Sequence, residues 1–286
     1  MATLRGPSST LGTTTSQTTA PEGALVRRLL VIGIGAGDPD FVTVGAVDAL
    51  NRVDVFLVLD KGPATKDLTA ARRAVCERFI THDRWRIVEL SDPERDRSSG
   101  TQAVAGRYVR AVDGWRDERA ALLERALAEE LPDGGTAGFL VWGDPSLYDG
   151  TIRVIEAIAA HGALELDWEV IPGITSVQAL TARHRILLNR VAGAVHLTTG
   201  RRLAAGLPDN ADDIVVMLDS DLICRAYADQ DLDIYWGAYL GTEDEILVAG
   251  KLAEVIDEIA EKRAEARSRK GWVMDTYLLR RPDRDG

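Results

Sequence analysis

The sequence predicts an α/β protein of two domains: an N-terminal doubly wound parallel sheet and a C-terminal α/β domain with a mixed sheet. Three observations lead to this class. The chain has 286 residues, which is enough for two domains. Up to about residue 183, apolar strand-like segments alternate with helical segments, as in a parallel sheet covered by helices on both faces. Beyond that point, strand-like segments follow one another with little helix between them, which indicates a mixed sheet.

The first domain begins with an apolar run, Leu29 to Ile32, which does not alternate and is therefore typical of a strand buried on both faces. Strands of this domain are expected at 27–34, 54–59, 85–90, 138–142 and 168–171. Helices are expected between them at 43–51, 66–78, 151–160 and, as one long helix or a pair, 101–131. Thr43 is suited to cap the first helix.

The second domain is expected to contain strands at 194–199, 214–218, 234–240, 245–249 and 272–278. A turn at 241–244 joins two of them as a hairpin. A long helix is expected at 251–270, because Leu252, Ile256 and Ile259 lie on one apolar stripe. Gly271 is a natural stop for this helix. The stripe suits either a core or a dimer contact.

The composition limits which binding partners and which cellular compartment the protein is expected to have. No apolar run approaches the roughly 18 residues that a membrane helix needs, so we expect no membrane contact. The formal net charge of −11 disfavours a nucleic-acid partner, because a protein that binds nucleic acid needs a basic face. Cys76 and Cys224 have no CxxC partner, which argues against a disulfide scaffold or a zinc site and fits a reducing cytoplasm.

The domain boundaries follow from the same patterns. Residues 1–24 are rich in Ser, Thr, Gly and Pro, and we expect a disordered tail because they offer too little apolar surface to order themselves. No continuous apolar core follows Arg5, so a signal peptide is not expected. The N-terminal domain is assigned to 27–182 and the C-terminal domain to 183–286.

Three loops that end strands of the first domain form the candidate site, at 33–39, 143–148 and 172–176. The carboxyl ends of parallel strands meet at one edge of a sheet, where ligands bind in open α/β folds. The first loop is not a classical dinucleotide fingerprint, because Asp38 stands where the third glycine is required. In the second loop, Asp144 places a carboxylate at the mouth of the site.

In this order and spacing, the three loops resemble those of the tetrapyrrole methylase family, which transfers methyl groups from S-adenosylmethionine to corrinoid precursors. The resemblance covers 27–279. Within the family, the sequence is most similar to the branch that methylates C1 in aerobic cobalamin synthesis. The closer match lies in 59–61, 141–149, 176–180, 182–185, 198–202, 235–245 and 271–280. The sequence has Ala36 where the family usually has proline, and Trp142 where it often has glycine. Both departures resemble the sequences of this branch.

The resemblance implies a homodimer that methylates precorrin-5 at C1 and releases acetate, and the cysteine usage places it in the cytoplasm. It also implies that S-adenosylmethionine binds between the two domains, without a metal. Carried over residue by residue, the cofactor ligands are Gly143, Asp144, Leu147, Thr175, Ser176, Met217, Leu240, Gly241 and Gly250. Asp144 has the charge to face a cationic cofactor or to bond its ribose hydroxyls.

Acetate release requires a general base. Asp60, Tyr148 and His184 are candidates by position alone. The other histidines, His82, His161 and His196, have no carboxylate or cysteine at ligand spacing and are given no role.

A substrate with many carboxylates can bind to a net acidic protein if positive charge is concentrated at the binding site. The negative charges elsewhere on the protein matter little, because electrostatic fields are screened beyond about 8 Å at physiological salt. Arginine suits the forked binding of carboxylates. The candidates are Arg183, Arg185, Arg201 and Arg202. Three alternatives stay open: methylation at another ring carbon, methylation of a protein or ribosomal RNA by the same fold, and a nucleotide-binding regulatory module without catalysis. The acidic net charge weakens the RNA alternative.

Overall fold

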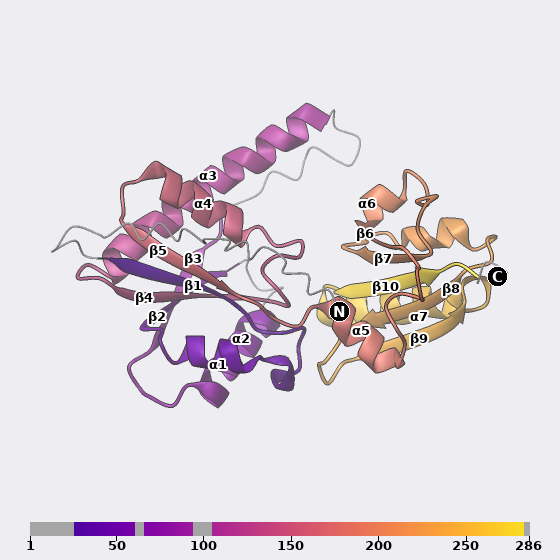
Figure 1. The fold of residues 1–286 in the computed structure, drawn as a ribbon, viewed down its shortest axis with the longest axis horizontal. Coiled ribbons are helices and arrows are strands. Elements are labelled where there is room, and N and C mark those ends of the chain that lie inside the picture. The colour runs from indigo at the N-terminus through magenta and orange to yellow at the C-terminus, as the bar shows by residue number, and fades with distance from the viewer. Residues whose placement is uncertain (1–25, 61–65, 94–104, 283–286) are drawn as a thin grey trace, which may run out of the picture.

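The computed structural model describes residues 26–60, 66–93 and 105–282, so the tail expected at 1–24 lies outside the described residues. Two α/β lobes lie side by side along the long axis of the molecule, and each is built on a sheet of its own (Figure 1). This arrangement confirms the predicted class, a parallel sheet followed by a mixed one.

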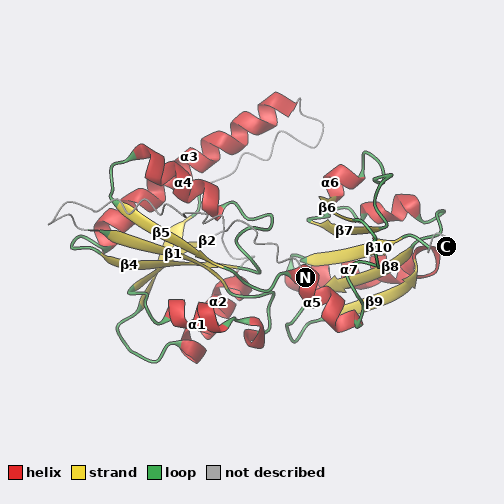
Figure 2. Ribbon diagram, viewed as in Figure 1, coloured by secondary structure: helices red, strands yellow, loops and turns green. Residues whose placement is uncertain are grey.

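The first sheet has the strand order β3-β2-β4-β1-β5, and every neighbouring pair is parallel. Its strands are β1 (Arg27–Gly33), β2 (Val55–Asp60), β3 (Arg86–Ser91), β4 (Gly135–Val141) and β5 (Leu166–Ile171). Helices α1 (Val44–Leu50) and α2 (Lys66–Phe79) cover one face, and α3 (Ala105–Glu130) and α4 (Thr151–His161) cover the other (Figure 2). The segment expected as one helix or a pair is a single helix in its described part.

The unbroken apolar run of β1 follows from this two-sided cover. Leu29 and Val31 pack in the core under α3 and α4, while Leu30 and Ile32 pack in the core under α1 and α2. Every position of the strand from Leu29 to Gly33 is therefore buried, which removes the alternation that a one-sided sheet would show. Thr43 caps α1 as expected, because its side-chain oxygen accepts a hydrogen bond from the N–H of Ala46.

The second sheet has the order β6-β7-β10-β8-β9, with β6 and β7 parallel and the other pairs antiparallel. Its strands are β6 (Val195–Thr199), β7 (Asp213–Met217), β8 (Asp233–Ala238), β9 (Ile246–Lys251) and β10 (Asp275–Arg280). Helix α7 (Leu252–Lys270) buries its apolar stripe in the core of this domain, so the stripe is not available to a second subunit. Gly271 ends the helix in the left-handed conformation, at φ 78°.

Four short elements were not expected from the sequence: α5 (Ser176–His184), α6 (Gly200–Leu203) and the 3-10 helices η1 (Pro39–Phe41) and η3 (Ile223–Tyr227). Helix α5 begins with a capping box between Thr175 and Gln178, a pattern that is visible in the sequence. Val177 and Leu180 of α5 pack against Val215 and Leu278 of the second sheet. The division between residues 182 and 183 stays a prediction, and this packing favours a boundary before α5.

Candidate active site

The loops after β1, β4 and β5 meet at the carboxyl edge of the first sheet, as the sequence predicted. The N–H of Gly143 donates to the carbonyl oxygen of Gly35 at 2.8 Å, and the N–H of Gly35 donates back to Gly143 at 3.3 Å. A Cβ atom on Gly33 would lie 2.6 Å from the backbone nitrogen of Gly173. Only glycine permits backbones to approach this closely, so these glycines bring the three loops together.

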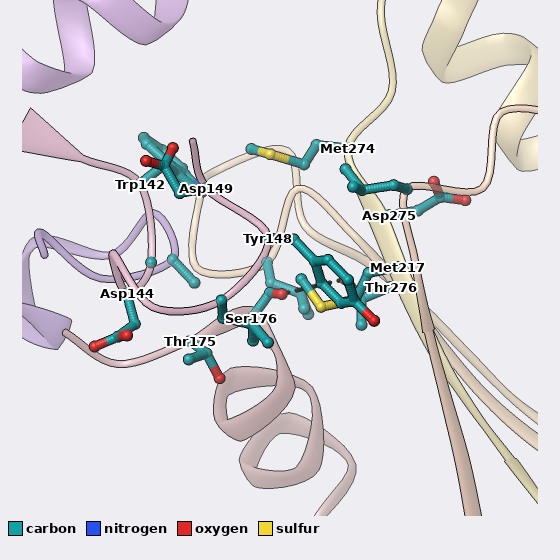
Figure 3. A pocket seen from close by; sticks show the side chains of 15 residues that line it. Trp142, Asp144, Tyr148, Asp149, Thr175, Ser176, Met217, Met274, Asp275 and Thr276 are labelled. Atoms are coloured by element: carbon teal, nitrogen blue, oxygen red, sulfur yellow. Dashed lines mark hydrogen bonds between the residues drawn. The ribbon is translucent and has the colours of Figure 1, made fainter. Parts of the chain in front are cut away.

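The Asp144 carboxylate bridges two of these loops. Its Oδ2 accepts a hydrogen bond from the N–H of Gly173 at 2.8 Å, and its Oδ1 accepts from the N–H and the hydroxyl of Ser146. Burial by itself raises the pKa of Asp144, but these hydrogen bonds outweigh it and hold the pKa below its ordinary value. Asp144 therefore organises the loops, and Figure 3 shows its carboxylate turned away from Tyr148 and Met217.

A cavity of about 170 Å³ lies between these loops and the second sheet (Figure 3). Residues of both domains line it, which accords with a site between the domains. Most of the predicted cofactor ligands line this cavity. They are Gly143, Asp144, Leu147, Thr175, Ser176, Met217 and Leu240. The hydroxyls of Ser176 on α5 and Thr276 on β10 lie 3.2 Å apart, which joins two of its walls.

Gly241 and Gly250 are not among the residues that line the cavity. Gly241 instead lies where the second domain touches the loop after β1, because a Cβ there would come within 2.6 Å of the backbone nitrogen of Asp38. Gly250 lies in β9, opposite Ile234 of β8. Their predicted contact with the cofactor is untested.

Two residues at the cavity have a strained backbone. Tyr148 and Leu218 both have φ 53°, a left-handed conformation that costs a non-glycine residue about 1–3 kcal/mol. Both are large apolar side chains that remain 45% and 66% exposed. Such strain persists where the surrounding structure imposes it, and it gathers at functional sites. Burial also raises the pKa of Tyr148, so its phenol stays protonated and is able to donate a hydrogen bond.

A second, more open groove of about 520 Å³ adjoins the cavity at Tyr148, which lines both. The groove follows β6, the edge strand of the second sheet, and continues over α6. His196, Leu197, Thr198 and Arg202 contribute to its wall. It therefore combines apolar surface, hydroxyls and a cation next to the cavity.

The comparisons with known proteins agree with this geometry. The family model of the tetrapyrrole (corrin/porphyrin) methylases matches residues 28–256. The chain belongs to the tetrapyrrole methylase family. It is 47% identical over 256 residues to a precorrin-6A synthase [deacetylating] from Sinorhizobium. The aligned residues cover 90% of this methylase and 96% of its relative.

Solved structures support the same assignment. The methylase is 38% identical to a cobalamin synthesis related protein (CobF) from Corynebacterium diphtheriae, with a TM-score of 0.77, covering 91% of the methylase and 100% of that chain. A uroporphyrin-III C-methyltransferase from Thermus thermophilus, solved in complex with S-adenosylhomocysteine, is 19% identical, with a TM-score of 0.53 and coverage of 88% and 96%. At that identity, the likeness shows the fold alone.

Of the three candidate bases in this methylase, Tyr148 lines the cavity and the groove. Asp60 lies at the exposed end of β2 and is not among the residues lining either. His184 is likewise absent from both linings, and its Nε2 donates to the carbonyl oxygen of Trp236 at 3.0 Å. Burial lowers the pKa of His184. Tyr148 is therefore the one of these three that lies beside the site, where its protonated phenol is suited to donate a hydrogen bond and not to act as a base.

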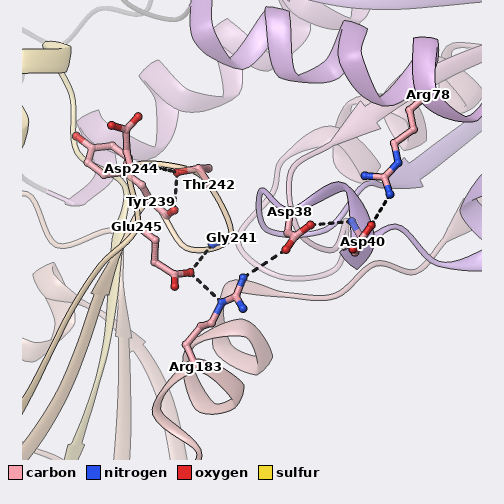
Figure 4. Close-up of polar contacts among 9 residues, drawn as sticks. All are labelled: Asp38, Asp40, Arg78, Arg183, Tyr239, Gly241, Thr242, Asp244 and Glu245. Atoms are coloured by element: carbon pink, nitrogen blue, oxygen red, sulfur yellow. Dashed lines mark hydrogen bonds and ion pairs between the residues drawn. The ribbon is translucent and has the colours of Figure 1, made fainter.

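Arg183 joins the two domains of the methylase (Figure 4). Its Nε donates to Oε2 of Glu245 at 3.0 Å, and its NH2 group donates to Oδ2 of Asp38 at 3.3 Å. The same Glu245 oxygen accepts the N–H of Gly241 at 2.7 Å. Two protein carboxylates thus already occupy the guanidinium that was predicted to bind the substrate.

The other predicted arginines differ in position. Arg202 lines the groove beside Tyr148. Arg185 and Arg201 are exposed but are not among the residues that line the cavity or the groove. Binding of substrate carboxylates by any of them is untested, and the groove favours Arg202.

Several lining residues of the methylase were missed in the sequence: Trp142, Asp149, Leu218, Met274, Asp275 and Thr276. Trp142 and Asp149 flank the loop that was recognised. The others come from the ends of β7 and the start of β10, two strands that pair across a long stretch of chain.

No group of three or more His, Cys, Asp or Glu side chains in 26–60, 66–93 and 105–282 is arranged to hold a metal ion. In the same part of the chain, no helix is long and apolar enough to cross a membrane.

Proposed function

We propose that this methylase transfers the methyl group of S-adenosylmethionine to C1 of precorrin-5 and releases the C1 acetyl group as acetate, giving precorrin-6A. The observation that carries this proposal is the near full-length similarity to precorrin-6A synthase, at 47% identity. The geometry supports it, because a cavity for a small cofactor opens beside a larger groove, and methyl transfer requires two ligands in contact.

The residues of the cavity fit S-adenosylmethionine. Leu147, Met217 and Leu240 offer apolar surface to the adenine, and Ser176 offers a hydroxyl to the polar parts of the molecule. Gly143 lets a ligand lie close to the backbone. When bound, the cofactor supplies a methyl group on a positively charged sulfur.

The protein contributes mainly position. Methyl transfer needs an in-line approach of the ring carbon to the methyl group, and holding the reactants in that geometry supplies much of the rate. The groove along β6 would receive the macrocycle, with exposed Leu197 against its apolar face and Arg202 towards its carboxylates. Tyr148, which lines both spaces, then lies where the two reactants meet.

We also propose that the methylase is a cytoplasmic homodimer that acts without a metal, a membrane or nucleic acid. The acidic charge and the two buried free cysteines support a reducing compartment and a small-molecule substrate.

Turnover of precorrin-5 with methyl-labelled S-adenosylmethionine tests the proposal. Mass spectrometry should show a macrocycle that has gained the labelled methyl group and lost its acetyl group. A product that is methylated but retains the acetyl group would indicate another ring carbon. Tight binding of the cofactor without turnover of any precorrin would indicate a regulatory module.

A further inference from the structure

Loss of the acetyl group places a demand on the site that methyl transfer does not. A water molecule has to attack the acetyl carbonyl while the same ring carbon faces the methyl donor. The base that activates this water must therefore lie where the cavity meets the groove, beside Tyr148. This requirement rests on the proposed function.

The carboxylates of the cavity are already engaged by protein donors. Both oxygens of Asp144 accept hydrogen bonds from the loops. Asp149 accepts the N–H of Thr151 at 2.7 Å, at the start of α4. Asp275 accepts hydrogen bonds from Trp236 at 3.0 Å and from Arg263 at 2.9 Å. These groups build the walls, which makes them poor choices for a base that has to take a proton from water.

Three of the four histidines also have structural partners. The ring of His82 lies 3.2 Å from the carbonyl oxygen of Asn51. His161 pairs with Glu124 at 2.9 Å, and His184 bonds to a backbone carbonyl of β8.

His196 differs from these three. It is exposed, it lies in the edge strand β6, and it lines the groove together with Tyr148. Within the part of the chain that the structure describes, no hydrogen bond or ion pair holds its ring. Imidazole is the side chain most often used as a general base, and this one lies open to the groove.

We propose that His196 is the general base for acetate release and that the Tyr148 hydroxyl donates a hydrogen bond to the acetyl carbonyl oxygen. Water loses a proton to a ring nitrogen of His196 as its oxygen bonds to the acetyl carbon. Negative charge develops on the carbonyl oxygen, where a fixed donor stabilises it.

The remaining bonds then follow in balance. The bond between the acetyl carbon and C1 breaks, acetic acid leaves, and the electron pair stays on C1 within the conjugated macrocycle. That pair forms the new bond to the methyl group of the cofactor, and the bond from the methyl group to sulfur breaks with its electrons left on sulfur. Water and S-adenosylmethionine are the only co-reactants needed.

The test uses the full chain with His196→Ala and His196→Gln, and it follows acetate and S-adenosylhomocysteine separately. Each variant should release acetate about 100-fold more slowly or worse, which is the usual contribution of a general base. Because both products depend on the same electron pair, S-adenosylhomocysteine formation should fall with it. Cofactor affinity and melting temperature should stay at the wild-type value, and added imidazole should restore part of the rate of His196→Ala.

His161→Ala is the matched control, since it removes an exposed histidine that lines neither the cavity nor the groove and should leave acetate release unchanged. Tyr148→Phe should slow acetate release about 100-fold, the usual loss for one such donor. Wild-type acetate release by His196→Ala, or a loss that imidazole does not recover, would overturn the assignment. Failure of the wild-type enzyme to release acetate at all would instead reject the proposed function.

Discussion

Replacing Gly173 by Ala tests whether the close approach of three loops builds the cofactor cavity. A Cβ atom at this position would lie 2.8 Å from the carbonyl carbon of Gly33 and closer still to the carbonyl oxygen of Gly143, whereas ordinary contacts begin at 3.4 Å. Both neighbours are backbone atoms, so no side-chain rotation relieves the clash. One of the loops has to move.

The size of the effect follows from these contacts. Overpacking of this kind costs about 1–3 kcal/mol of unfolding free energy. Moving the loop also breaks the 2.8 Å hydrogen bond from Gly173 to the partly buried Asp144, which contributes about 1.5 kcal/mol at the low end for a charged acceptor. The sum is about 3 kcal/mol, or a fall in melting temperature of roughly 6–12 °C for a chain of this size.

The assay combines thermal melting with calorimetric titration of S-adenosylhomocysteine. Gly173→Ala should bind this ligand at least about tenfold more weakly, since a loss of about 1.4 kcal/mol suffices. Gly45→Ala is the control, because the nearest atom to its added Cβ, the Thr43 hydroxyl oxygen, lies 4.0 Å away. If Gly173→Ala melts and binds as Gly45→Ala does, the three-loop contact does not build the cavity.

Three further predictions concern charged residues. Arg183→Ala should weaken cofactor binding a few-fold and leave the precorrin KM unchanged, because Arg183 joins the domains; a raised KM alone would restore its predicted role as a substrate ligand. Arg202→Ala should raise the precorrin KM about tenfold, because it removes one charge-assisted hydrogen bond to the substrate. The cofactor affinity measured by calorimetry should stay unchanged. An unaltered KM would place the macrocycle outside the groove. Asp144 has a lowered folded-state pKa, so its ionised form stabilises the protein above its unfolded pKa of about 3.9, and this stability is lost as pH falls through the folded value. Asp144→Asn should therefore lose less stability than wild type in acid denaturation below about pH 4, and identical acid curves would contradict this reading.

The elements of the fold that could be predicted are those determined by local pattern. The two-sided burial of β1 is visible as an unbroken apolar run, and the cap of α1 is visible as Thr43 before an apolar-periodic segment. The meeting of the three loops follows from parallel topology, because the carboxyl ends of parallel strands share one edge.

Other features depend on packing between segments far apart in the chain. Helix α5 packs on the second sheet through Val177 and Leu180, although most of its residues had been assigned to the first domain. The place of Thr276 in the cavity depends on β10 pairing with β7 and β8, which no local pattern specifies. Arg183 looked available for a substrate because its partners, Asp38 and Glu245, lie 145 and 62 residues away in sequence.

The proposed role of His196 also depends on residues far apart in the chain. No role for it could be predicted from the sequence, because no carboxylate or cysteine stands at ligand spacing from it. Its interest comes from sharing a groove with Tyr148, which lies on the other domain. A site made where two domains meet is assembled by tertiary structure, so its members do not share a motif.

The ratio of acetate to S-adenosylhomocysteine, measured in one reaction of the wild-type enzyme with precorrin-5 and S-adenosylmethionine, tests the central claim most directly. The account predicts one acetate for each S-adenosylhomocysteine at every time point, because the electron pair released at C1 is the one that accepts the methyl group. S-adenosylhomocysteine formed without acetate would contradict it.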